Sequence, residues 1–224
     1  MHKTRVPKNI SKSQSSISST KKLVKKIYSV EEIHNIEKKE FKKLRNSYLL
    51  MKRAGINCAN KIYKSKLNRK FIVLCGPGNN GGDGLVISQA LNKLNQNVIL
   101  YSLDRKAYKG DAKIAYKKNL LYKKKYEDLY VPKNSVIIDC LFGIGINRNI
   151  KGFYKKIIRK VNNSKQHIIS IDIPSGINGN NGRIMGAAIK ANYTYTLHAK
   201  KIGLTINSGL QYSGKISIID IGIK

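Results

Sequence analysis

Short apolar segments alternate with helical segments along most of the chain. The apolar segments, which predict buried strands, cover residues 71–75, 97–102, 135–140, 167–171, 193–197 and 215–219. The helices predicted between them cover residues 84–94, 111–122 and 154–161. Apolar strands separated by helices are typical of a mostly parallel sheet with both faces covered. The pattern therefore predicts an α/β fold, and ligands of such folds bind at the carboxyl ends of the strands.

A helical pattern precedes this alternation, between residues 30 and 66. Ser29 and Glu32 have the spacing of a capping box, which predicts that the first helix begins after Ser29. The apolar side chains that then recur at helical spacing are Ile33, Ile36, Phe41 and Leu44. A second helix is predicted around residues 49–54, so two helices lead into the first strand.

The first 29 residues differ in composition from the rest of the chain. They hold eight lysine or arginine residues, no acid and a serine-rich stretch. Because such a segment has too few apolar residues to form a core, we predict a disordered tail over residues 1–29 and one domain over residues 30–224. The basic, serine-rich composition also suits an organelle-targeting peptide, an alternative that the sequence leaves open.

The net charge of +32 indicates either an acidic partner or a surface that is simply rich in lysine. The basic residues are spread over the whole chain, and aromatic residues that stack on bases are sparse, with four phenylalanines and no tryptophan. A lysine-rich surface is the favoured interpretation, although thirteen tyrosines keep nucleic-acid binding open. No apolar run approaches the roughly 18–20 residues of a membrane span. With three widely spaced cysteines, we expect a soluble, cytoplasmic protein in a reducing compartment.

Acids and glycines follow three of the predicted strands. The glycine-rich segment 76–83 follows the first strand, Asp139 and a loop with Gly143 and Gly145 end the third, and Asp172 ends the fourth. Because the carboxyl ends of parallel strands lie at one edge of a sheet, we expect these groups to meet there. The chain has only twelve acids, so their placement at strand ends predicts a site.

The glycine-rich segment matches the pattern G-x-G-x-x-G, in which glycines let backbone N–H groups approach an anion at a helix N-terminus. With Asp104 as a ribose-binding acid, this pattern would suit a dehydrogenase. Asn79, Asn80 and Asp83 favour a different ligand, because amides and a carboxylate suit a cation or a sugar better than a bare phosphate.

Oxygen atoms from Asn80, Asp139 and Ser175 are of the kind that a hard monovalent or divalent cation prefers. The alternative is that each side chain only satisfies backbone groups of its own loop. Asp172 also has two interpretations. It either accepts hydrogen bonds within the Pro-Ser-Gly turn that follows it, or has a pKa raised by burial and acts as general acid and base.

Three ordered motifs, at residues 76–84, 139–145 and 170–176, carry a family resemblance. They resemble the NAD(P)H-hydrate epimerase family, also called the YjeF N-terminal domain. Lys52 stands where that family usually has glutamate, and residues 177–182 replace a more acidic turn. Neither departure touches the ligands that the resemblance implies.

The resemblance implies a three-layer α/β/α Rossmann-like sandwich that interconverts the R and S hydrates of NADH and NADPH, which carry a hydroxyl at C6 of the nicotinamide ring. It implies that Asp172 is catalytic and that Asn80, Asp139 and Ser175 bind one potassium ion per subunit. The residues that would contact the hydrate are Asn79, Asn80, Gly81, Gly82, Asp83, Gly143, Ile144, Gly145, Ile146, Asn147, Arg148, Asn149 and Asp172. It further implies a homodimer and, since the chain ends at Lys224, a separate dehydratase for the product.

A second class of function stays open from the sequence. The same fold serves without catalysis as an RNA- or protein-binding module, and a chain of net charge +32 would suit the former. Carboxylates at the pocket repel phosphates, so Asp139 and Asp172 favour the epimerase over nucleic-acid binding. The dehydrogenase alternative lacks a visible proton-transfer residue.

Overall fold

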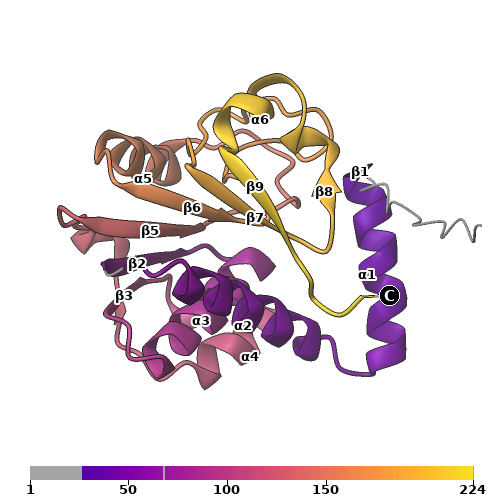
Figure 1. Ribbon diagram of the computed structural model, residues 1–224, viewed down its shortest axis with the longest axis horizontal. Coiled ribbons are helices and arrows are strands. Elements are labelled where there is room, and N and C mark those ends of the chain that lie inside the picture. Colours follow the sequence, from indigo (N-terminus) through magenta and orange to yellow (C-terminus); the bar gives the residue numbers. More distant parts are fainter. Residues whose placement is uncertain (1–26, 68, 224) are drawn as a thin grey trace, which may run out of the picture.

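A seven-stranded sheet forms the centre of the computed structural model, which describes residues 27–67 and 69–223 (Figure 1). The strand order is β4-β3-β2-β5-β6-β7-β9, and every pair of neighbours is parallel. The strands are β2 (Lys70–Cys75), β3 (Val98–Tyr101), β4 (Lys123–Lys124), β5 (Ser135–Cys140), β6 (His167–Ile171), β7 (Tyr193–Leu197) and β9 (Lys215–Ile219). All six predicted strands are present, each within one residue of its predicted bounds.

Helices cover both faces of this sheet. The α-helices of the described chain are α1 (Val30–Leu44), α2 (Tyr48–Lys64), α3 (Asn79–Lys93), α4 (Gly110–Lys118), α5 (Gly152–Asn163) and α6 (Asn207–Tyr212). Helices α2, α3 and α4 lie on one face and α5 on the other (Figure 1). This confirms the predicted three-layer α/β/α sandwich. Within the described residues, no helix has the length and apolar character needed to cross a membrane.

The apolar run of β2 explains why both faces need a cover. Side chains alternate between the faces of a strand, so Phe71 and Val73 pack against α2 and α3, whereas Ile72 and Leu74 pack in the layer of α5. All four are at most 1% exposed. Burying one such side chain contributes about 1.5–3 kcal/mol, so a strand that is apolar on both sides is stable only between two helical layers.

The helix α3 begins at Asn79, five residues before the predicted start at residue 84. The asparagines and glycines just before residue 84 therefore belong to the first turns of α3, with Gly78 as N-cap. Glycine allows a close approach here: a Cβ on Gly76 would lie 1.7 Å from the carbonyl oxygen of Leu141, and a Cβ on Gly81 would lie 1.8 Å from that of Gly76. The helix can begin this early because its glycines fit against neighbouring backbone.

The helix α4 ends at Lys118 rather than at the predicted residue 122. The side chain of Asn119 accepts a hydrogen bond from the backbone of Leu121 and donates one to the carbonyl of Leu85 on α3. These bonds turn the chain, and Lys123–Lys124 then pairs with β3 as the edge strand β4. The prediction was wrong because this ending depends on a contact with α3.

A second, two-stranded sheet joins the first described residues to a segment near residue 200. The strand β1 (Ile27–Tyr28) runs parallel to β8 (Lys200–Lys201), and α1 stands beside β8 at one end of the molecule (Figure 1). The capping box of α1 is confirmed, because the Glu32 N–H donates to Ser29 Oγ at 3.1 Å and the Ser29 N–H to Glu32 Oε2 at 2.8 Å. Most of the predicted tail, residues 1–26, lies outside the described residues.

The close contact at Gly76 gives a prediction for stability. In Gly76→Ala the new methyl group collides with the backbone of Leu141, so we expect the free energy of unfolding to fall by roughly 3 kcal/mol. Gly78→Ala is the control, since no atom lies within 4 Å of its Cβ position. Urea denaturation measures both, and equal stability of the two variants would contradict the close approach.

Candidate functional site

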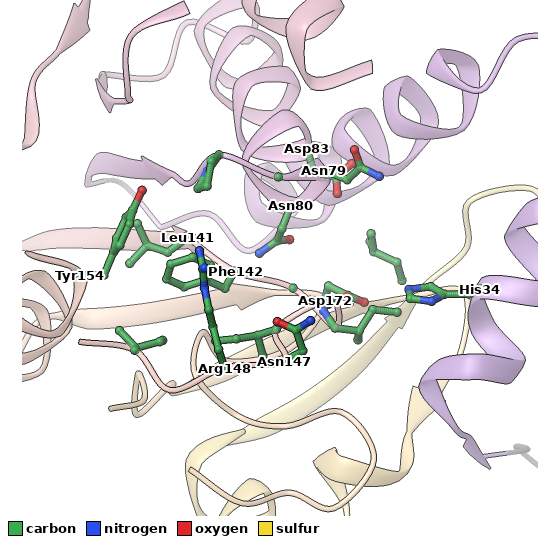
Figure 2. A pocket seen from close by; sticks show the side chains of 18 of the residues that line it. His34, Asn79, Asn80, Asp83, Leu141, Phe142, Asn147, Arg148, Tyr154 and Asp172 are labelled. Atoms are coloured by element: carbon green, nitrogen blue, oxygen red, sulfur yellow. Dashed lines mark hydrogen bonds between the residues drawn. The ribbon is translucent and has the colours of Figure 1, made fainter. Parts of the chain in front are cut away.

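A cavity of about 630 Å³ opens at the carboxyl ends of β2, β5 and β6 (Figure 2). Its walls come from α1, the start of α3, the loop after β5 and the end of β6. The predicted residues that line it are Asn79, Asn80, Asp83, Gly143, Ile144, Gly145, Ile146, Asn147, Arg148, Asn149 and Asp172. The structure thus brings together three segments that the sequence placed at separate strand ends.

Four of the predicted site residues do not line the cavity. Gly81 and Gly82 turn toward protein, the first against Gly76 and the second against Met51 and Ala112. Asp139 and Ser175 are completely buried. The two glycines therefore serve helix packing, and the two polar residues form a layer beneath the cavity.

The carboxylate of Asp139 organises this buried layer. It accepts hydrogen bonds from Ser175 Oγ at 2.5 Å, Ser175 N at 2.9 Å, Ser170 Oγ at 2.7 Å and Leu141 N at 3.2 Å. Burial raises the pKa of Asp139, and the hydrogen bonds from Ser175, Ser170 and Leu141 oppose that rise. Four donors on one carboxyl group hold the turn after β6 against the end of β5.

Asn80 is the exception to this satisfied polar layer. Its side chain projects from the first turn of α3 toward the loop after β5 (Figure 2). The residue is 6% exposed, and neither its Oδ1 nor its Nδ2 has a hydrogen-bond partner in the described part of the chain. Because a buried amide without partners costs free energy, its position indicates a ligand.

Gly143 separates Asn80 from Asp172. A Cβ built on Gly143 would lie 3.2 Å from Asp172 Oδ2 and 3.3 Å from Asn80 Cβ. The lack of a side chain at this position therefore lets the loop after β5 pass between the two polar residues. Asn80, Asp139 and Ser175 offer amide, carboxylate and hydroxyl oxygens, which is the chemistry of a hard cation.

Asp172 has an unusual backbone for a residue with a side chain. Its φ is 68°, and the Ile173 N–H donates to the carbonyl of Ile171 across it at 2.9 Å, as in a γ-turn of positive φ. Such a conformation costs of order 1–3 kcal/mol and is found where a site requires it. Here it turns the carboxyl group into the cavity, where Oδ2 accepts a long hydrogen bond of 3.4 Å from the N–H of Ile144.

Lys201 compensates the charge of Asp172. Its side chain is 1% exposed, and its ammonium group lies 2.5 Å from Asp172 Oδ1. The same group donates to the carbonyl of Leu197 at 2.8 Å and to Thr196 Oγ1 at 3.1 Å. A buried ammonium group is stable only when its donors are satisfied, and three acceptors meet that requirement.

Two further carboxyl groups share the cavity with Asp172. Burial raises the pKa of Asp83 well above its usual range, and the charges of Asp172 and Glu37 raise it further against the opposing charge of Lys201. Burial also raises the pKa of Glu37 to about 7, again with a contribution from Asp172 and opposed by Lys201. Both groups therefore hold protons at a pH where an exposed carboxyl is ionised.

The two ends of the cavity differ in charge. Arg148 and Tyr154 lie at one end, and Asp172 and His34 at the other (Figure 2). The N-terminus of α3, which carries a partial positive charge, forms part of the wall. This arrangement suits an elongated ligand that has anionic groups at the end near Arg148 and a polar reactive ring at the end near Asp172.

The sequence missed His34 and Glu37, which line the cavity from α1. Glu37 carried a signal, since it stands four residues after Ile33 on the face where helical spacing places apolar side chains. Lys201, the partner of Asp172, was also missed. Its pairing joins residues far apart along the chain, which spacing does not reveal.

A parallel sheet between helical layers, with a polar cavity at the carboxyl ends of its strands, is typical of Rossmann-type ligand-binding proteins and enzymes. Residues 47–203 match the family described as YjeF-related protein N-terminus, and the chain belongs to this family. The crystal structure of yeast ynu0 has the same fold, with a TM-score of 0.70 at 21% identity over 86% of this chain and 87% of that one.

Several relatives of this chain are named as enzymes of NAD(P)H-hydrate repair. The NAD(P)H-hydrate epimerase of Lentilactobacillus buchneri is 36% identical, over 87% of this chain and 93% of the relative. That of Oenococcus oeni is 34% identical, over 79% and 87%. The bifunctional NAD(P)H-hydrate repair enzyme Nnr of Dictyoglomus turgidum is 41% identical, over 70% of this chain and 32% of the relative.

The buried ion pair gives a second prediction for stability. Lys201→Met keeps most of the side-chain volume but leaves Asp172 without its counter-charge, so we expect the free energy of unfolding to fall by about 3–5 kcal/mol. Lys200→Met is the matched control, because Lys200 is half-buried and has no ion-pair partner among the described residues. Urea denaturation of both variants measures the difference, and similar losses would argue against the ion pair as the cause.

Proposed function

We propose that this protein is an NAD(P)H-hydrate epimerase, an isomerase that interconverts the R and S hydrates of NADH and NADPH and so serves the repair of damaged cofactor. The named relatives cover most of its length at above 30% identity. The observation that carries the proposal is Asp172, held by Lys201 in a strained turn at the wall of the cavity. Strain and a buried charge at one residue are features of a reactive site.

The cavity suits a dinucleotide whose reactive ring is polar. We place the hydrated nicotinamide at the end with Asp172, and the phosphates toward Arg148 and the N-terminus of α3. The loop residues 143–149 then cover the ligand between these two ends. This placement uses both charged ends of the cavity.

In this placement Asp172 acts on the hydroxyl at C6. Loss of the hydroxyl leaves positive charge on C6 and the adjacent ring nitrogen, and a fixed carboxylate stabilises that charge. Lys201 and the N–H of Ile144 keep the carboxylate in one orientation. Water then returns to either face of the flat ring, which interconverts the two hydrates.

Potassium belongs to the same proposal. Asn80, Asp139 and Ser175 would hold the ion, and the unpartnered oxygen of Asn80 supports this assignment. A bound potassium ion supplies positive charge that offsets the buried carboxylate of Asp139. These three residues come from α3, β5 and the turn after β6, so the ion would connect three elements of the fold.

Two further parts of the proposal concern partners. Relatives from Dictyoglomus turgidum and Thermofilum pendens are named bifunctional repair enzymes, and this chain covers 32% and 35% of them. We therefore expect the epimerase to act together with a dehydratase activity. We also propose a homodimer, which light scattering of the purified protein measures.

Asp172→Asn tests the reaction. We expect the rate of R-to-S conversion, followed by chromatography and corrected for the uncatalysed rate, to fall by about 10²–10⁴-fold. Asp220→Asn is the control, since Asp220 is exposed at the end of β9 and does not line the cavity. Thermal unfolding checks that the first variant is folded, and a folded Asp172→Asn protein with the wild-type rate would contradict the role of this carboxylate.

Asn80→Ala tests the ion. Potassium chloride is expected to raise the unfolding temperature of the wild type above that in choline chloride of equal ionic strength, because an ion that binds only the folded state stabilises it. In Asn80→Ala we expect potassium chloride to cause no such rise in the unfolding temperature. Without potassium the variant should be at least as stable as the wild type, since the substitution removes a buried amide that lacks partners. An equal effect of potassium on both proteins would place the ion elsewhere.

A further inference from the structure

The inward face of α1 carries a carboxyl group where packing alone would place an apolar side chain. Ile33 and Glu40 are buried on this face, and Glu37 lies between them, half-buried. Glu40 forms an ion pair with Lys43 at 3.5 Å. Glu37 has no hydrogen-bond or ion-pair partner among the described residues, and it faces the cavity instead. It is thus the acid of α1 that is positioned for a ligand.

The surroundings of Glu37 are those of a proton donor. His34, one helical turn earlier, extends from α1 toward the part of the cavity where Asp172 lies (Figure 2), so this face of α1 is directed at Asp172. The nearby charged groups from the other elements are Asp172, Asp83 and Lys201. Lys201 already donates to Asp172, Thr196 and the carbonyl of Leu197.

Asp172 alone does not meet the needs of the reaction. Both of its oxygens already accept hydrogen bonds, Oδ1 from Lys201 and Oδ2 from Ile144. A carboxylate held in this way stabilises positive charge, but the departing hydroxyl also needs a proton.

We propose that Glu37 is a second catalytic residue of this site and the proton donor to the hydroxyl at C6. The inference rests on the epimerase function proposed above. The Glu37 carboxyl gives its proton to the hydroxyl oxygen, the C6–O bond breaks, and its electron pair leaves with the new water molecule. The lone pair of the ring nitrogen stabilises the C6 cation. Water then adds to C6 from either face and returns a proton to Glu37, so that no oxidant or reductant is needed.

The titration of Glu37 supports this role. Its pKa is raised from 4.5 to about 7 by burial and by Asp172, so the protonated form is available near neutral pH. The folded state therefore binds this proton more tightly than the unfolded chain. The resulting stability is complete below pH 4.5 and is lost as the pH rises through about 7.

The experiment compares Glu37→Gln with Glu40→Gln. Glu40 is the matched control, because it lies one turn further along α1 and does not line the cavity. The rate of R-to-S conversion is measured across the pH range for both variants and the wild type. We expect the wild-type kcat to fall above pH of about 7 as Glu37 loses its proton. In Glu37→Gln we expect a kcat at least about 100-fold lower, a KM close to that of the wild type and no change near this pH. Glu40→Gln should keep the wild-type profile.

A low rate in Glu37→Gln is not expected to come from unfolding. The substitution removes a carboxyl group whose ionised form is unfavourable at this half-buried position. The unfolding temperature of Glu37→Gln at pH 8 should equal or exceed that of the wild type. A wild-type rate in Glu37→Gln, or a slow variant that keeps the pH dependence, would overturn the assignment. A wild type without activity on either hydrate would instead overturn the epimerase proposal.

Discussion

The ion pair between Lys201 and Asp172 is the interaction on which the site depends. An ammonium group at 1% exposure needs acceptors for all its donors, and it finds them on β7 and at the end of β6. This requirement fixes the position of β8 relative to the sheet. Because β8 also pairs with β1, which leads directly into α1, the same contact helps to hold α1 beside the cavity.

The charge distribution inside the protein opposes that of the chain as a whole. A molecule of net charge +32 has gathered Glu37, Asp83 and Asp172 around one cavity, with Lys201 as the ammonium group buried beside them. Like charges in a region of low dielectric cannot all ionise, so part of the cluster keeps its protons. Proton chemistry is thus a property of the cavity, whereas the lysine-rich surface says little about the reaction.

Much of the fold and part of the site could be predicted from the sequence. The strands were predictable because apolar runs buried on both faces leave few alternatives, and Asp139, Asp172 and Ser175 were predictable as neighbours because parallel strands end at one edge. The start of α3 was missed because it depends on backbone fitting around glycines. Glu37 and its place at the cavity were missed because α1 is held beside the site by the pairing of β1 with β8, two strands that lie far apart along the chain.

The register of the two-stranded sheet places Tyr28 opposite Lys201. Lys201 therefore contributes to two parts of the fold. Its backbone pairs with β1, which precedes α1, and its side chain reaches Asp172 at the carboxyl end of β6 in the large sheet. Because β1 leads directly into α1, a displacement of α1 that breaks this pairing would act on the backbone of Lys201, the residue that neutralises Asp172. The two-stranded sheet thus connects the helix that forms one wall of the cavity to the lysine that balances the charge inside it.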